Sequence, residues 1–63
     1  MFIKEFRERL GLSQFDLSKC LNVTQSAVSQ YETGVREPPL DKLITMSELF
    51  GCTIDELVRG ENK

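Results

Sequence analysis

The chain contains no histidine, and this absence removes the side chain used most often for general acid–base catalysis and for zinc binding. No glycine-rich phosphate-binding loop is present, and no nucleophile can be paired with a base. The sequence therefore predicts that the protein is not an enzyme. It also offers no evident site for a metal, a cofactor or a small-molecule ligand.

Cysteine is scarce as well. Cys20 and Cys52 lie far apart and form no C-x-x-C pair. We expect both to be thiols on small side chains in or beside the core, since a reducing compartment keeps them unoxidised. A disulfide or a zinc site is the alternative, and zinc is disfavoured by the lack of histidine.

Long apolar runs are missing too. No stretch approaches the roughly 20 apolar residues needed to cross a bilayer. Charges interrupt the first residues, MFIKE, so the start does not resemble a secretory leader. With 63 residues and no internal repeat, the chain is expected to form one domain, 1–63, and to be cytoplasmic.

Positive charge is limited for a protein that would bind nucleic acid, because the formal net charge is −2. Residues 1–36 carry five cations and four anions, whereas residues 37–63 carry three cations and six anions. The acidic part is therefore expected to lie away from any nucleic-acid face. The attraction of one copy for phosphate should be weak.

What the chain does contain is a series of short amphipathic segments separated by glycine. Each of the four glycines follows such a segment, as glycines do when they close a helix in the left-handed conformation. No segment alternates with a period of two, which would indicate a strand. The sequence predicts an all-α fold of five helices, over about residues 2–10, 14–21, 25–32, 40–50 and 54–59.

Hydroxyl residues precede three of these helices. Ser13, Thr24 and Thr53 are placed to accept a hydrogen bond from the backbone at a helix start. Asp16 and Glu56 follow three residues after Ser13 and Thr53, which is the spacing of a capping box.

Apolar spacing of i, i+3 and i+4 predicts which sides of the outer helices face inward. For the helix at 2–10 the predicted stripe is Phe2, Ile3, Phe6 and Leu10. For the helix at 40–50 it is Leu40, Leu43, Ile44, Ser47 and Phe50.

The helix at 25–32 has two chemically different sides. At about 100° per residue, its apolar residues Ala27, Val28 and Tyr31 fall on one side. A solvated face usually carries charged residues, but the opposite side has only amides and hydroxyls. Glutamine can make two hydrogen bonds to adenine and serine can donate or accept, so this side is predicted to read base edges rather than simply meet water. The polar side consists of Gln25, Ser26, Ser29, Gln30 and Thr33.

This helix follows the helix at 14–21 after the tight step Leu21-Asn22-Val23. Two helices joined so closely form a helix-turn-helix, which can present its second helix to the major groove of double-stranded DNA. The N-termini of the helices at 14–21, with Ser13 and Gln14, and at 40–50 are candidates for holding phosphate. Arg36 is the best placed cation, and we favour a phosphate contact over a simple solubility charge.

The pattern L-G-L-S-Q-x-D-L-S-x-x-L-x-V-T-x-x-x-V-S-x-Y-E-x-G-x-R-x-P resembles the Cro and phage-repressor type of helix-turn-helix. The later segment L-D-K-L-I-T-M-S-E-L-F-G-C-T-I-D-E-L-V is similar to the fourth and fifth helices of that fold. The resemblance covers nearly the whole chain. It implies a compact five-helix, lambda-repressor-like domain that binds a roughly palindromic operator as a dimer.

The resemblance also implies roles for single residues. Base contacts would come from Gln25, Ser26 and Gln30, with Ser29 nearby. Gln14 and Thr24 would touch phosphate, and Ser13, Thr33 and Arg36 complete the predicted phosphate contacts. Arg7 and Glu32 match a largely buried ion pair of such domains; the alternative is an exposed pair of little energetic effect.

Three departures from the family pattern bear on structure. Asn22 stands where the turn usually has glycine, but Asn tolerates the left-handed conformation, so the turn is expected to form. Ser18 replaces a common alanine, and a small residue still satisfies that position. Phe15 occupies a position that is normally polar; it covers the core edge, stacks near the DNA backbone or mediates self-association, and the sequence leaves all three open.

The sequence thus predicts a sequence-specific DNA-binding transcriptional regulator, a repressor, that acts as a homodimer because one subunit has few cations. Candidates for the dimer surface are Ile54, Leu57 and Val58, although part of this apolar surface must serve the core. The alternative is a protein-interaction adaptor of the antitoxin or anti-repressor type, which the acidic residues 37–63 favour.

Overall fold

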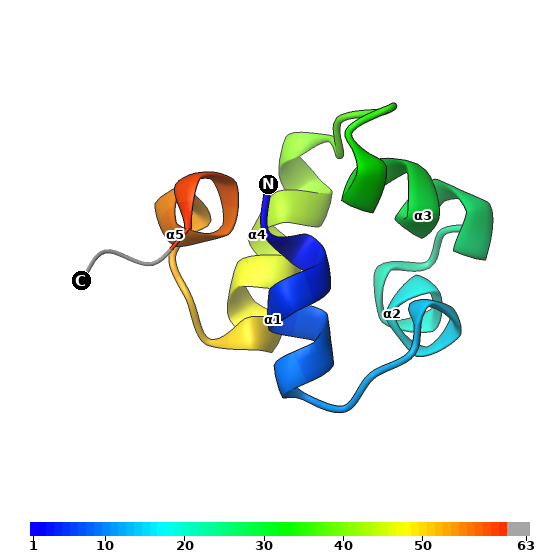
Figure 1. The fold of residues 1–63 in the computed structure, drawn as a ribbon, viewed down its shortest axis with the longest axis horizontal. Helices are drawn as coiled ribbons and strands as arrows, with labels where there is room; N and C mark the ends of the chain where they lie inside the picture. The colour runs from blue at the N-terminus through cyan, green and yellow to red at the C-terminus, as the bar shows by residue number, and fades with distance from the viewer. Residues whose placement is uncertain (61–63) are drawn as a thin grey trace.

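A computed structural model describes residues 1–60 as five α-helices. The central helices α1 and α4 have α2 and α3 on one side and α5 on the other (Figure 1). The predicted all-α class is confirmed. The predicted bounds of α2, α4 and α5 agree with the structure, whereas α1 is one residue shorter at each end and α3 is one residue longer. The helices are α1 Ile3–Arg9, α2 Gln14–Leu21, α3 Gln25–Thr33, α4 Leu40–Phe50 and α5 Ile54–Arg59. Glu61 and Lys63, which enter the charge count, lie outside the described residues.

Local hydrogen bonds begin three of the helices. The hydroxyl oxygens of Ser13 and Thr53 each accept the N–H of the residue three positions on, Asp16 or Glu56, at 3.0 Å. The carboxylates of Asp16 and Glu56 accept the cap residue's own N–H at 2.9 Å, which completes both capping boxes. Thr24 caps α3 with its hydroxyl oxygen. These bonds join groups within three residues, which explains why the starts of these helices could be predicted.

A single core draws on all five helices. Helix α2 supplies Leu17 and Leu21, and α3 supplies its whole predicted apolar side. The rings of Phe6 and Phe50, from α1 and α4, stack with their centroids 5.9 Å apart. The buried apolar residues are Ile3, Phe6, Leu17, Leu21, Ala27, Val28, Tyr31, Met46 and Leu57. Because no helix has a core of its own, each depends on the other four for its position.

The predicted inward face of α4 is wrong in its rotation. Leu40 and Ile44 are 65% and 43% exposed, whereas Met46 is fully buried. Leu43 and Phe50 pack against the core as expected. Leu43 and Phe50 also share a helical stripe with Met46. The apolar spacing therefore allowed two adjacent inward faces, and packing against the neighbouring helices selects the face that contains Met46.

The predicted stripe of α1 is correct only at its centre. Ile3 and Phe6 are buried, but Phe2 and Leu10 are 39% and 48% exposed. Both exposed residues are cap residues that lie just outside the helix, so they leave its inward face. Arg7 takes the next position on the buried side.

The cysteines lie in different environments. Cys52 is half-buried and packs against the core, as expected. Cys20 is exposed, contrary to the expectation, because Leu17, Ser18 and Leu21 occupy the buried side of α2. No helix within residues 1–60 has both the length and the apolar composition to cross a bilayer.

Candidate nucleic-acid interface

Asn22 makes the turn between α2 and α3. Its backbone is left-handed, with φ 56° and ψ 46°, and no other residue of the 1–60 segment apart from glycine has a positive φ. The N–H of Asn22 donates to the Lys19 carbonyl at 3.3 Å, and the N–H of Val23 donates to the Ser18 carbonyl at 3.0 Å. The expectation that the turn forms without glycine is confirmed. The second helix can therefore begin with only three residues, 22–24, between it and the end of the first.

Helix α3 separates its apolar and polar residues by burial. Val28 is fully buried, and Ala27 and Tyr31 are each 6% exposed. On the other side, Gln25 and Ser26 are exposed. Of the remaining polar residues, Thr33 is exposed, and Ser29 and Gln30 are half-buried. A row of amides and hydroxyls therefore stays available to a partner along the outer side of α3.

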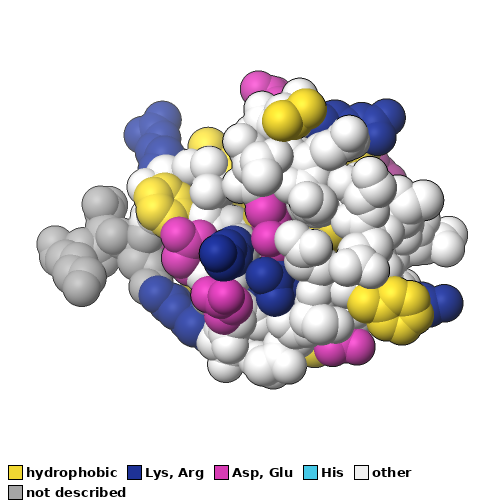
Figure 2. Space-filling view, turned by 45° about the vertical axis from the view of Figure 1, so that its right-hand side comes forward, with side chains coloured by type: hydrophobic (Ala, Val, Ile, Leu, Met, Phe, Trp, Pro, Cys, Tyr) yellow, Lys and Arg dark blue, Asp and Glu magenta, His cyan; other side chains and the backbone are white. Residues whose placement is uncertain are grey.

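This outer side is almost free of formal charge. Helix α3 has no lysine or arginine, and its one charged residue, Glu32, is turned inward with a side chain that is 5% exposed. Figure 2 shows mostly uncharged polar side chains and backbone over α2 and α3, with cations around the edge of this face. Any cations that hold a polyanion here must therefore come from the segments that border α3.

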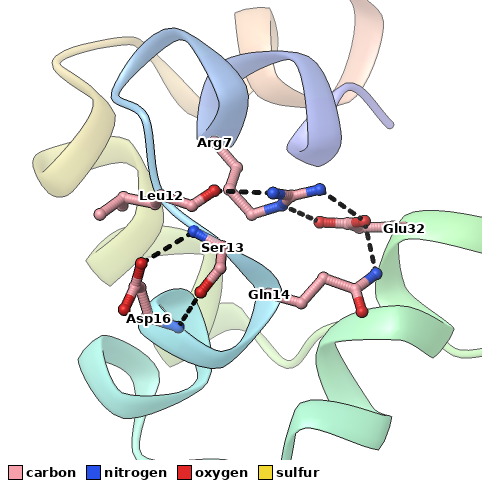
Figure 3. A network of polar contacts seen from close by, with 6 residues as sticks. All are labelled: Arg7, Leu12, Ser13, Gln14, Asp16 and Glu32. Carbon is pink, nitrogen blue, oxygen red and sulfur yellow. Dashed lines mark hydrogen bonds and ion pairs between the residues drawn. The ribbon is translucent and has the colours of Figure 1, made fainter.

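Arg7 and Glu32 anchor this face to the body of the molecule (Figure 3). The Arg7 Nε lies 2.6 Å from Glu32 Oε2, and the two side chains are 10% and 5% exposed. Arg7 Nη1 donates to the Leu12 carbonyl at 2.7 Å, and Gln14 Nε2 donates to Glu32 Oε1 at 3.0 Å. The hydrogen bond that Arg7 donates to Glu32 raises the pKa of Arg7 above its ordinary value, so the guanidinium remains charged. One carboxylate thus links α1, the start of α2 and α3.

The residues predicted to contact phosphate lie in three places: at the start of α2, at the start of α3 and at the end of α3. The hydroxyl oxygens of Ser13 and Thr24 accept the N-cap hydrogen bonds of α2 and α3. The Ser13 hydroxyl is also engaged with the Asp16 carboxylate, whereas the Thr24 O–H can donate outward. Gln14 donates one amide N–H to Glu32, and its second amide N–H can donate to another partner.

The other two lie at the far end of α3. Thr33 donates its hydroxyl to the Gln30 carbonyl at 3.3 Å, which turns that proton back along the helix. Arg36 is exposed, and its backbone N–H donates to the Gln30 carbonyl at 3.2 Å, which keeps it close to the end of α3. Of these two, only Arg36 presents donors outward.

One cation at this face was missed by the sequence analysis. Lys19 is exposed on α2, with its Nζ 5.2 Å from the centroid of the Phe15 ring. The i, i+4 spacing of the two residues was the available signal, since side chains at that spacing are neighbours on a helix.

The dimer candidates from the sequence need one correction. Leu57 is fully buried within the monomer, so it belongs to the core and has no surface to offer a partner. Ile54 is half-buried and Val58 is 38% exposed. Only these two of the three can take part in an interface without opening the core.

Comparison with known proteins gives a consistent result. The helix-turn-helix family matches residues 3–57. The chain is 36% identical over 59 residues to the HTH-type transcriptional activator BcrR of Enterococcus faecalis, across 94% of this chain and 29% of that protein. It is 32% identical over 59 residues to Repressor protein C2 of Salmonella phage P22, across 94% of this chain and 27% of that protein.

A solved structure agrees with these sequence matches. The crystal structure of the P22 c2 repressor in complex with synthetic operator 9T matches with a TM-score of 0.85 and 32% identity, over 94% of this chain and 89% of that chain. The chain therefore belongs to the helix-turn-helix family of the Cro and phage-repressor type, a family of DNA-binding transcriptional regulators rather than of enzymes. It spans between 27% and 29% of the length of these two curated relatives.

Proposed function

We propose that the protein is a sequence-specific transcriptional regulator that reads double-stranded DNA with α3 in the major groove. The observation that carries this proposal is the outer side of α3, where Gln25 and Ser26 are exposed while Val28, on the opposite side, is fully buried. An uncharged row of amides and hydroxyls suits hydrogen bonding to base edges. Gln25, Ser26, Ser29 and Gln30 are its proposed base contacts.

The proposed phosphate contacts surround this helix. Ser13 and Gln14 lie at the start of α2, and Thr24 lies at the start of α3. Arg36 follows the end of α3, and Thr33 joins the set only if its hydroxyl turns away from the Gln30 carbonyl. These contacts position the helix, whereas the base contacts supply specificity.

The test begins with selection of bound sequences from a random duplex library. Gln30→Ala should then weaken binding to the selected operator by about 1–3 kcal/mol and relax one base position. Binding to random duplex, which depends on phosphate contacts, should change little and serves as the control. Unchanged affinity and unchanged base preference would show that the reading face is assigned wrongly.

A homodimer on a roughly palindromic operator follows from the shortage of cations. Two copies double the number of phosphate contacts and read half-sites about one helical turn apart, roughly 34–36 Å. Apolar side chains that α4 and α5 offer for such an interface include Ile54 and Val58 of α5 and Leu40 and Ile44 of α4. Val58→Asp should shift the protein toward monomer in sedimentation equilibrium and weaken operator binding, whereas an unchanged association constant would exclude Val58 from the interface.

Repression is the proposed effect, because occupying a DNA site is enough to exclude other proteins from it. A reporter gene placed behind the selected operator measures the direction of the effect, and increased expression would identify an activator. A cytoplasmic location follows from this function. The adaptor alternative predicts that no concentration of protein shifts random duplex DNA in a low-salt mobility assay.

A further inference from the structure

Phe15 is an exposed aromatic side chain with a defined neighbour. Its side chain is 54% exposed, so it does not cover the edge of the core. Lys19, one turn further along α2, places its ammonium 5.2 Å from the centroid of the ring. This contact orients the ammonium without neutralising it, since the ring has no net charge.

Phe15 and Lys19 border a groove of about 320 Å³ on the surface. Asn22 of the turn and Thr24 and Gln25 at the start of α3 also line it. Ser18 and Val23 complete the lining, so one depression combines an apolar ring, a cation, two hydroxyls and two amides. Thr24 and Gln25 also belong to the proposed DNA contacts, so the groove and the reading face are continuous.

We propose that this groove binds the sugar–phosphate backbone of the DNA strand that borders the major groove occupied by α3. The Phe15 ring packs against deoxyribose, and the Lys19 ammonium pairs with the adjoining phosphate. The proposal rests on the proposed function of α3 and adds two contacts to it. It also selects DNA-backbone stacking from the three interpretations that the sequence left open for Phe15.

Two arguments favour DNA as the occupant. The first is charge: α3 carries no cation of its own, and Lys19 lies beside its start while Arg36 follows its end, so the two bracket the helix with positive charge. The second is continuity, because Gln25 lines the groove and also belongs to the exposed outer side of α3. A protein seated there would compete with DNA for the residue that begins the reading face.

The experiment compares two variants with matched controls on the same selected operator duplex. Lys19→Gln is paired with Lys4→Gln, since Lys4 is an exposed lysine in the first turn of α1. Phe15→Ala is paired with Leu10→Ala, since Leu10 is 48% exposed at the end of α1. Fluorescence anisotropy gives Kd at several salt concentrations, and circular dichroism melting checks that each variant is folded.

Lys19→Gln should raise Kd by a similar factor on operator and random duplex, and should reduce the salt slope of log K by about one per subunit. Between about 50 and 200 mM salt, wild type should therefore lose roughly 3.5-fold more affinity per subunit than this variant. Phe15→Ala should raise Kd several-fold with the salt slope unchanged, because it removes no charge. Both control variants should behave as wild type.

The failures can be told apart. If Gln30→Ala impairs operator binding while Lys19→Gln and Phe15→Ala match their controls, the groove does not contact DNA and the proposed function stands. If Lys19→Gln and Phe15→Ala bind DNA like wild type but no longer change the expression of a reporter gene, the occupant of the groove is a protein, and the proposal is overturned. If wild type binds no duplex at low salt, both the proposed function and the groove assignment are wrong.

Discussion

Lys42 of α4 donates a hydrogen bond to the main-chain carbonyl of Leu21, the last residue of α2, with an Nζ–O distance of 2.8 Å. The carbonyl is one of those at a helix C-terminus that has no partner within its own helix. A cation at this end also complements the helix dipole. Lys42 therefore secures the end of α2 directly before the left-handed turn at Asn22, and so helps to hold the two helices of the motif in place.

Replacing Lys42 with methionine keeps most of the apolar stem and removes this bond. Lys42→Met should lower the free energy of unfolding by about 1–2 kcal/mol, because the bond is charge-assisted and only partly exposed to water. Urea denaturation with an unchanged m-value measures the loss. Asp41→Asn is the control, since it removes the exposed Lys42–Asp41 pair at 3.8 Å and a first-turn carboxylate of α4, and it should change stability by less than about 1 kcal/mol. Equal stability of the two variants would contradict the capping role.

Breaking the Arg7–Glu32 pair from one side should be severe. Arg7→Met leaves the Glu32 carboxylate buried without its cation and frees the Leu12 carbonyl, so a loss of about 3–5 kcal/mol is expected. A domain of this size has a stability of roughly that magnitude, so the variant should be largely unfolded by circular dichroism at ambient temperature. The double variant Arg7→Met/Glu32→Met should recover part of the loss, because it removes both charges together. Strictly additive losses would show that the pair is not coupled.

Asp16 gives the stability a dependence on acid pH. The hydrogen bond from the Ser13 N–H, and next that from the Ser13 side chain, holds the pKa of Asp16 below its ordinary value of 3.8. The stabilisation is therefore complete above the ordinary pKa and is lost as pH falls through the lowered pKa of the folded state.

Asp16→Asn tests this dependence through thermal melting across the acid range. Wild type should have the higher Tm at neutral pH, and the gap between the two proteins should close as the pH falls below the folded-state pKa. The neutral-pH difference serves as the internal control. A gap that stays constant down to the lowest pH would remove Asp16 from this role.

The left-handed residue at the turn makes a further prediction. Asn22→Ala should destabilise the protein by about 1 kcal/mol, because a Cβ next to a left-handed backbone is strained and alanine lacks the local polar compensation of asparagine. Asn22→Gly should be at least as stable as wild type, and therefore at least about 1 kcal/mol more stable than Asn22→Ala, since glycine adopts the left-handed conformation freely. Chemical denaturation of the three proteins measures both differences. Alanine and glycine variants of equal stability would mean that the turn has rearranged.

The sequence by itself determined the five helices, their caps at Ser13, Thr24 and Thr53, and the polar outer side of α3. Each of these features depends on groups that lie within a few residues of one another. A capping hydroxyl reaches an N–H three positions away, and Ala27 and Val28 differ so strongly in polarity from Gln25 and Ser26 that only one rotation of α3 buries its apolar side.

Only the tertiary structure decided which stripe of α4 turns inward, that Leu57 belongs to the core, and that Lys42 reaches the end of α2. It also brought Phe15 and Lys19 of α2 together with the start of α3 in one groove. These features depend on where all five helices come to rest. Apolar spacing allowed Met46 or Ile44 to face the core, and close packing against the neighbouring helices buried Met46.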